Sequence, residues 1–84
     1  MTPPDTFAFH ARHPRGTEGY VVLLFRPEAD GRLRSREWPS EGYAAPGRDA
    51  ETTVDELMAR VRDWARAGWT FTEQPERISD WLHR

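Results

Sequence analysis

The stretch that decides the fold is YVVLLFRPEADGRLRSREW, residues 20–38. Residues 20–25 are apolar without a break and rich in β-branched and aromatic side chains. This pattern favours a central strand that is covered on both faces of the sheet. Pro27 ends that strand, and the Asp-Gly pair at 30–31 is a turn signal between two strand-like segments. Residues 20–25 and 32–38 are therefore predicted to form a β-hairpin.

An amphipathic helix is predicted in TVDELMARVRDWARAG, residues 53–68. Thr53 and Glu56 have the spacing of a capping box, and Gly68 stands where a left-handed residue commonly ends a helix. Glu56 and Arg60 are predicted to form an i,i+4 ion pair on the outer face of the helix. One helical stripe of apolar residues predicts the buried side: Val54, Leu57, Met58, Val61, Trp64 and Ala65.

The rest of the chain completes an α+β pattern. Residues 5–11 and 69–73 alternate apolar with polar or small residues, which is typical of strands. Residues 13–19 and 39–51 are predicted connections because they contain Pro and Gly. Pro75 opens a short final helix, whose inner side is expected to hold Ile78, Trp81 and Leu82.

The predicted order of elements is β-β-β-α-β-α. Each element has one apolar face or stripe to bury, and an antiparallel sheet packed by helices satisfies all of them together. The expected fold is a small antiparallel sheet of three to four strands, packed by one long amphipathic helix and a short C-terminal helix.

Length and composition place limits on the class of protein. The chain has 84 residues and is expected to be a single domain, 1–84, with residues 1–5 disordered. It has no cysteine, which excludes disulfides and thiolate metal sites. No segment resembles a membrane span or a signal peptide, so a cytoplasmic location is expected. No cofactor motif is present, and the expected cofactor is none.

The charge distribution disfavours a free-standing nucleic-acid binder. All twelve basic residues are arginine, a bias typical of a GC-rich bacterial genome, and the formal net charge is -2. The first 48 residues are nearly neutral, whereas residues 49–84 are acidic. Nucleic-acid-binding domains are usually basic.

The first candidate site is a stripe along residues 32–38. Side chains two residues apart share one face of a strand, which groups Arg32, Arg34, Arg36 and Trp38. Arginine and tryptophan are favoured anchors in protein interfaces, and the same row suits phosphates and a stacked base of single-stranded nucleic acid. A solvent-facing side of the sheet, with the arginines paired to cross-strand acids, is the third interpretation. Tyr43, in the following connection, either extends this surface or caps the core.

The second candidate site surrounds the loop before residue 20. It contains two imidazoles and two guanidinium groups: His10, Arg12, His13 and Arg15. This set would assist nucleic-acid binding, or acid–base cleavage of RNA by the two histidines. Alternatively, these four residues are the solvent-exposed polar end of a strand and have no specific function. A metal site is not expected, because a strand-to-loop segment does not hold both rings on one side and no third ligand is indicated.

The order of three predicted elements is also found in a known protein family. These elements are a hairpin, a Gly-containing connection and an amphipathic helix. Gly42 and Gly47 are five residues apart, with Tyr43 directly after the first glycine. The helix start then contains three further matching positions: Thr53, Asp55 and Glu56. Over residues 20–66 this arrangement resembles the N-terminal domain of HicB-type antitoxins, in which the residue after the first glycine is small. The resemblance implies a protein that masks a small basic toxin.

The sequence thus predicts a small cytoplasmic module that binds another protein, as an adaptor, regulator, antitoxin or inhibitor. The expected contact residues are Arg32, Arg34, Arg36, Trp38 and Tyr43, and a homodimer through a sheet edge is a further expectation. The alternative is a single-stranded nucleic-acid-binding protein that uses the same Arg/Trp face. An enzyme is not expected, because no convincing catalytic set is present.

Overall fold

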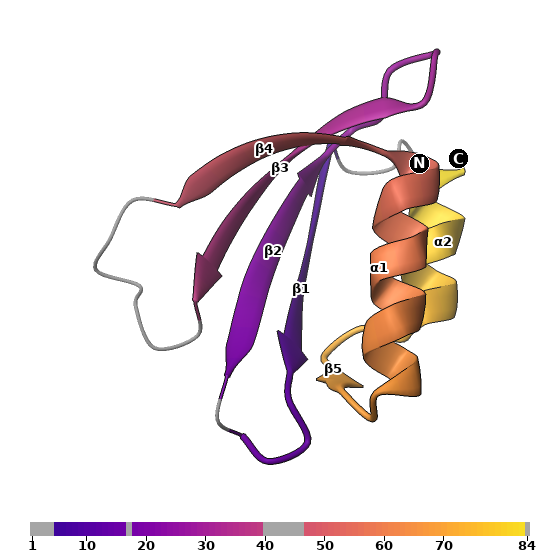
Figure 1. Ribbon diagram of the computed structural model, residues 1–84. Coiled ribbons are helices and arrows are strands. Elements are labelled where there is room, and N and C mark those ends of the chain that lie inside the picture. Colours follow the sequence, from indigo (N-terminus) through magenta and orange to yellow (C-terminus); the bar gives the residue numbers. More distant parts are fainter. Residues whose placement is uncertain (1–4, 17, 40–46, 84) are drawn as a thin grey trace.

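Five antiparallel strands form one sheet, and two helices pack against one face of it (Figure 1). The computed structural model describes residues 5–16, 18–39 and 47–83. The elements in chain order are β1 (Thr6–Arg12), β2 (Gly19–Phe25), β3 (Arg32–Pro39), β4 (Arg48–Thr53), α1 (Val54–Arg66), β5 (Thr70–Phe71) and α2 (Pro75–Leu82). The spatial order of the strands is β4-β3-β2-β1-β5. The α+β class and the antiparallel sheet agree with the prediction.

The predicted hairpin is the centre of this sheet. β2 pairs with β3 on one side and with β1 on the other. Gly31 has φ +86°, a left-handed conformation that glycine adopts readily. The prediction that the central strand is covered on both faces is wrong, because α1 and α2 lie on the same side of the sheet (Figure 1).

A single hydrophobic cluster joins the strands to both helices. Inward-facing residues of β1, β2 and β3 meet the apolar stripes of α1 and α2, since side chains alternate along strands and recur every three to four residues on helices. The buried members are Phe9, Ala11, Val22, Leu24, Leu33, Leu57, Val61, Ile78, Trp81 and Leu82. The three residues predicted for the inner side of the last helix are thus all in the core.

Both ends of α1 follow the predicted capping chemistry. The Thr53 hydroxyl accepts a hydrogen bond from the Glu56 amide at 3.1 Å. Gly68 has φ +88°, and the Trp69 amide donates to the Trp64 carbonyl at 2.9 Å, which closes a Schellman-type C-cap. The predicted Glu56–Arg60 pair is wrong: Arg60 instead forms its ion pair with Glu37 of β3.

β4 is the element that the sequence did not predict. Residues 48–51 belonged to the predicted connection, yet they pair with β3 in register from Arg48–Glu37 to Thr53–Arg32. The six residues of β4 contain no large apolar side chain, because an edge strand beyond the reach of the helices has little to bury. Conversely, β5 has two residues instead of the predicted 69–73. The sheet therefore has five strands where three to four were expected.

Two predictions lie partly or wholly outside the described residues. Tyr43 and Gly42 fall in the segment 40–46, and the predicted disorder concerns residues 1–4 as well as Asp5. Asp5 itself is described: its carbonyl accepts from the Arg26 amide at 3.0 Å, and its carboxylate lies 3.4 Å from the Arg26 guanidinium.

Candidate functional site

The side of the sheet that faces away from the helices presents a regular grid of side chains. Leu33 and Ser35 of β3 are buried toward the helices, so their neighbours Arg34 and Arg36 project from the opposite side. We call this side the open face. Its central part consists of ten residues: Ala8 and His10 of β1, Val21, Leu23 and Phe25 of β2, Arg34, Arg36 and Trp38 of β3, and Asp49 and Glu51 of β4. The same alternation places Thr6, Arg12, Arg32 and Thr53 at the ends of these strands on this side.

The rows of the open face have apolar residues at their centre, and two of them end at an acidic residue of β4. In the middle row, Ala8 pairs with Leu23, Leu23 with Arg36, and Arg36 with Asp49. In an adjacent row, Val21 lies between His10 and Trp38. The register therefore places an apolar column on β2 directly beside the row of arginines.

The apolar column is incompletely covered. Val21, Leu23 and Phe25 are each half-buried by their strand neighbours, and Ala8 is exposed. An apolar patch with arginine and an aromatic side chain beside it has the composition of a protein-binding surface.

The arginines of the predicted stripe differ in their partners. Arg32 lies 3.5 Å from Asp30 in the turn, and the Nε of Arg36 donates to Asp49 Oδ1 at 2.7 Å. The guanidinium carbon of Arg34 lies 5.6 Å from the centroid of the Phe25 ring, a cation–π arrangement. Among the described side chains, no carboxylate lies within 4.0 Å of the Arg34 guanidinium, so Arg34 differs from Arg32 and Arg36 in having no ion pair.

The Arg36–Asp49 pair shifts the titration of both groups. The hydrogen bond from Arg36 lowers the pKa of Asp49 despite its partial desolvation, and the charges of Arg36 and Arg34 add to that effect. The same hydrogen bond and charge raise the pKa of Arg36. Both groups stay ionised at neutral pH, which makes this part of the face zwitterionic.

Trp38 and Arg36 are held in place by a close backbone approach. A Cβ atom built on Gly47 would lie 2.6 Å from Trp38 Cε2 and 2.8 Å from Arg36 Cδ. Both distances are shorter than van der Waals contact, so only glycine fits here without displacing a neighbour. The main chain at Gly47 thus packs against both side chains at the border of the open face.

The two histidines of the second candidate site are not brought together. His10 projects on the open face beside Val21, whereas the His13 ring packs edge-on against Trp69 with centroids 5.5 Å apart. His13 Nδ1 also accepts from the Arg15 amide at 3.1 Å. Within residues 5–16, 18–39 and 47–83 no group of three metal-binding side chains occurs.

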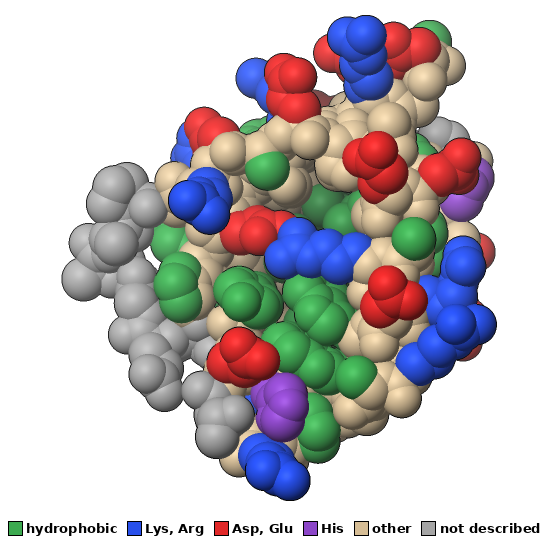
Figure 2. All heavy atoms as spheres, viewed as in Figure 1, with side chains coloured by type: hydrophobic (Ala, Val, Ile, Leu, Met, Phe, Trp, Pro, Cys, Tyr) green, Lys and Arg blue, Asp and Glu red, His purple; other side chains and the backbone are tan. Residues whose placement is uncertain are grey.

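An aromatic cluster that sequence reasoning did not predict lies at the side of the sheet covered by the helices. The rings of Tyr20, Trp64 and Trp69 have centroids 5.2–6.1 Å apart and planes within 20° of one another. Figure 2 shows the hydrophobic side chains gathered between the strands and α1. The Arg60 guanidinium lies over the Trp64 ring at 4.4 Å, and it also forms the ion pair with Glu37. The sequence signal for this cluster is the Gly68 turn, which folds Trp69 back onto Trp64.

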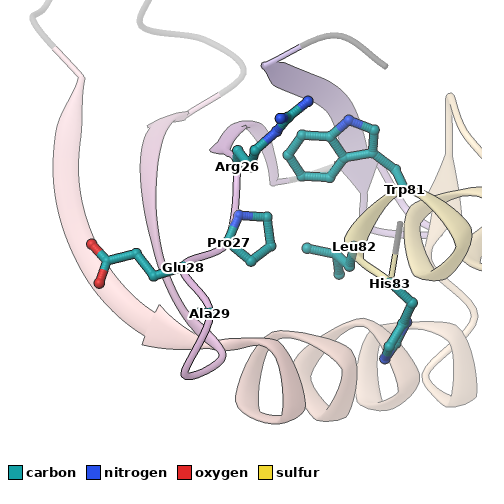
Figure 3. A pocket seen from close by; sticks show the side chains of 7 residues that line it. All are labelled: Arg26, Pro27, Glu28, Ala29, Trp81, Leu82 and His83. Carbon is teal, nitrogen blue, oxygen red and sulfur yellow. The ribbon is translucent and has the colours of Figure 1, made fainter. Parts of the chain in front are cut away.

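A hollow lies between the β2–β3 turn and the end of α2. In Figure 3, Pro27 and Leu82 point toward one another across it, and the Trp81 ring lies beside Arg26. Glu28 and His83 point away from the space. Specific ligand sites need polar groups that converge on the ligand, so this hollow is not assigned to a small molecule.

These features define a small α+β protein whose sheet is covered by helices on one face. Of the helices in the described ranges, none is both long and apolar enough to cross a membrane. Comparison of the chain with protein-family models, with curated proteins and with solved structures produced no match. A function for this chain is therefore inferred from the geometry of the open face.

Proposed function

We propose that this chain is a small protein-binding module whose contact surface is the open face of the sheet. The observation that carries the proposal is the apolar column Val21, Leu23 and Phe25, which neither α1 nor α2 covers and which lies beside Arg34 and Trp38. A partner surface would remove that column from water and give Arg34 an acceptor. Burial of apolar area drives association, and a buried Arg or Trp at the centre contributes most of the affinity.

The acids on the same face favour protein over nucleic acid as the partner. Asp49 and Glu51 lie in the same rows as Arg36 and Arg34, so a phosphate backbone on this face would meet carboxylates as well as guanidinium groups. The adaptor, regulator, inhibitor and antitoxin roles all need a surface of this kind. The resemblance to HicB-type antitoxins adds one specific candidate, a small basic toxin in the bacterial cytoplasm.

The test is capture of partners with a tagged chain from an extract of the source organism, with half of the sample treated with nuclease. We expect a stoichiometric protein that survives nuclease and that Arg34→Glu no longer retains. The matched control is Arg62→Glu, the same charge reversal at an exposed position of α1. Equal capture by Arg34→Glu and Arg62→Glu would refute the assignment of the open face. Loss of the captured material on nuclease treatment would instead indicate that the open face binds nucleic acid.

A further inference from the structure

We infer that the occupant of the open face is a second copy of this chain, packed sheet against sheet. This inference rests on the proposed function, since it requires the open face to be a protein-binding surface. Sheets with one apolar face commonly pack against another such face about 10 Å away. A closed dimer of identical copies uses the same patch twice, so the patch must complement itself.

The charges of the open face meet that condition. Its β3 side carries Arg34 and Arg36, and its β4 side carries Asp49 and Glu51 in the same two rows. Two cations and two anions give these two rows no net charge. Glu51 is exposed and stands across from Arg34 in the register without an ion pair between them, so the Arg34 of one copy and the Glu51 of the other are available to each other.

A strongly charged partner is expected to bind this face less tightly than a second copy of the chain does. A polyanion or an acidic protein would be attracted by the arginines and repelled by the neighbouring acids, because both signs occur within one strand spacing of each other. The whole chain has a formal net charge of -2. Two copies therefore repel each other only weakly at physiological ionic strength.

The size of the open face predicts a reversible dimer. Four strands about 4.8 Å apart and about six residues long give a projected area of about 400 Å² on each copy. Standard protein interfaces bury about 800 Å² of accessible surface on each partner. The corrugated surface of a sheet exposes more area than its projection, so the interface falls at the lower end of specific interfaces. We expect dissociation in the micromolar range.

The β4 edge of the sheet is a less suitable place for self-association than the open face. The β4 edge carries three charged residues in four positions, Arg48, Asp49 and Glu51. Charged side chains on an edge strand oppose pairing with another edge. The homodimer expected from the sequence is therefore assigned to the open face and not to the β4 edge.

The experiment is sedimentation velocity of the whole chain from low micromolar to near-millimolar concentration. The test variant is Leu23→Arg, at the centre of the apolar column, and the control is Ala59→Arg, at an exposed position of α1. We expect the wild type and Ala59→Arg to dimerise with rising concentration, and Leu23→Arg to require at least a tenfold higher concentration. A thermal melt of each variant checks that it folds.

A second measurement decides the outcome if Leu23→Arg does not fold. The chain has no cysteine, so Ala8→Cys and Ala59→Cys each accept a single spin label. Ala8 lies on the open face, and Ala59 lies on α1 on the other side of the sheet. The inference predicts a shorter distance between the two Ala8 labels of a dimer than between the two Ala59 labels.

Three results would overturn the inference: a wild type that stays monomeric at every concentration, a dimer that Leu23→Arg leaves intact, or a longer Ala8 than Ala59 distance. The proposed function fails separately. If the wild type is monomeric but Arg34→Glu abolishes capture of another protein, the open face remains a binding surface and only its self-association is refuted.

Discussion

Arg60 of α1 forms an ion pair with Glu37 of β3, and the same guanidinium lies over the ring of Trp64. The pair connects residues 23 positions apart in sequence. Glu37 is the inward-facing residue near the end of β3, and its side chain is only 15 % exposed. A carboxylate in that position needs a partner, because an unpaired buried charge is strongly destabilising. Arg60 thus joins the β3 side of the sheet to the helix.

Replacement of Arg60 by Met tests this connection. Met retains much of the apolar stem but leaves Glu37 without its ion pair and Trp64 without its cation–π contact. We expect the free energy of unfolding to fall by about 1–3 kcal/mol, the range for a buried polar group that loses its partner. Denaturant unfolding followed by tryptophan fluorescence measures the change.

The matched control is Glu56→Gln, on the residue that the sequence alone pairs with Arg60. Glu56 accepts a hydrogen bond from the Thr52 hydroxyl at 3.0 Å, and a Gln side chain can still accept it. A loss below about 0.5 kcal/mol is expected for this exposed position. A larger loss for Glu56→Gln than for Arg60→Met would contradict the assignment of Arg60 to Glu37.

The N-cap of α1 allows a local test of helix stability. Thr53→Ala removes the acceptor for the Glu56 amide, which should reduce stability by about 1 kcal/mol. For a domain of this size the melting temperature should fall by about 4–8 °C. Thr53→Ser keeps the hydroxyl and should melt close to the wild type. Equal losses in the two variants would show that the cap hydrogen bond is not the cause.

Asp49 is expected to titrate below the ordinary range of an aspartate. Its lowered pKa means that the carboxylate stabilises the folded state above the unfolded pKa of about 3.9. That contribution is lost as the pH falls through the lower, folded pKa. Carboxyl carbon chemical shifts measured against pH give the value directly. In Arg36→Gln the pKa of Asp49 should return toward its usual range, whereas Arg62→Gln should leave it unchanged.

Gly47→Ala should disturb the ion pair between Arg36 and Asp49, although Gly47 is not a member of it. The added methyl group would collide with Trp38 and with the stem of Arg36, so both side chains must shift. We expect the pKa of Asp49 to rise toward its ordinary value as Arg36 moves away. Overpacking of this kind destabilises by about 1–3 kcal/mol where neighbours are rigid, and the exposed stem of Arg36 favours the lower end. An unchanged Asp49 titration in Gly47→Ala would show that the site relaxes without displacing Arg36.

Local patterns were sufficient to predict several parts of the fold. The hairpin of residues 20–38 and both ends of α1 follow from turn and capping chemistry, which depends on residues close in sequence. The inner side of α2 follows from helical periodicity. β4 could not be found in this way, because its charged sequence Arg-Asp-Ala-Glu-Thr-Thr has no apolar alternation. Pairing with β3 alone makes it a strand.

The candidate site, too, could be predicted from the sequence only in part. Alternation along residues 32–38 groups Arg34, Arg36 and Trp38 on one side of a strand, but it cannot show what lies beside them. The tertiary structure adds the apolar column of β2 on one border and the acids of β4 on the other.

The sequence by itself determined the class of fold, the central hairpin and the capped helix, because these depend on interactions over a few residues. Only the tertiary structure decided that both helices occupy one face, that Arg60 reaches Glu37 instead of Glu56, and that β2 keeps one side uncovered. These outcomes depend on which segments distant in sequence come together. β2 is apolar on both faces yet packed on one, and its uncovered side is the physical basis of the binding surface that we propose.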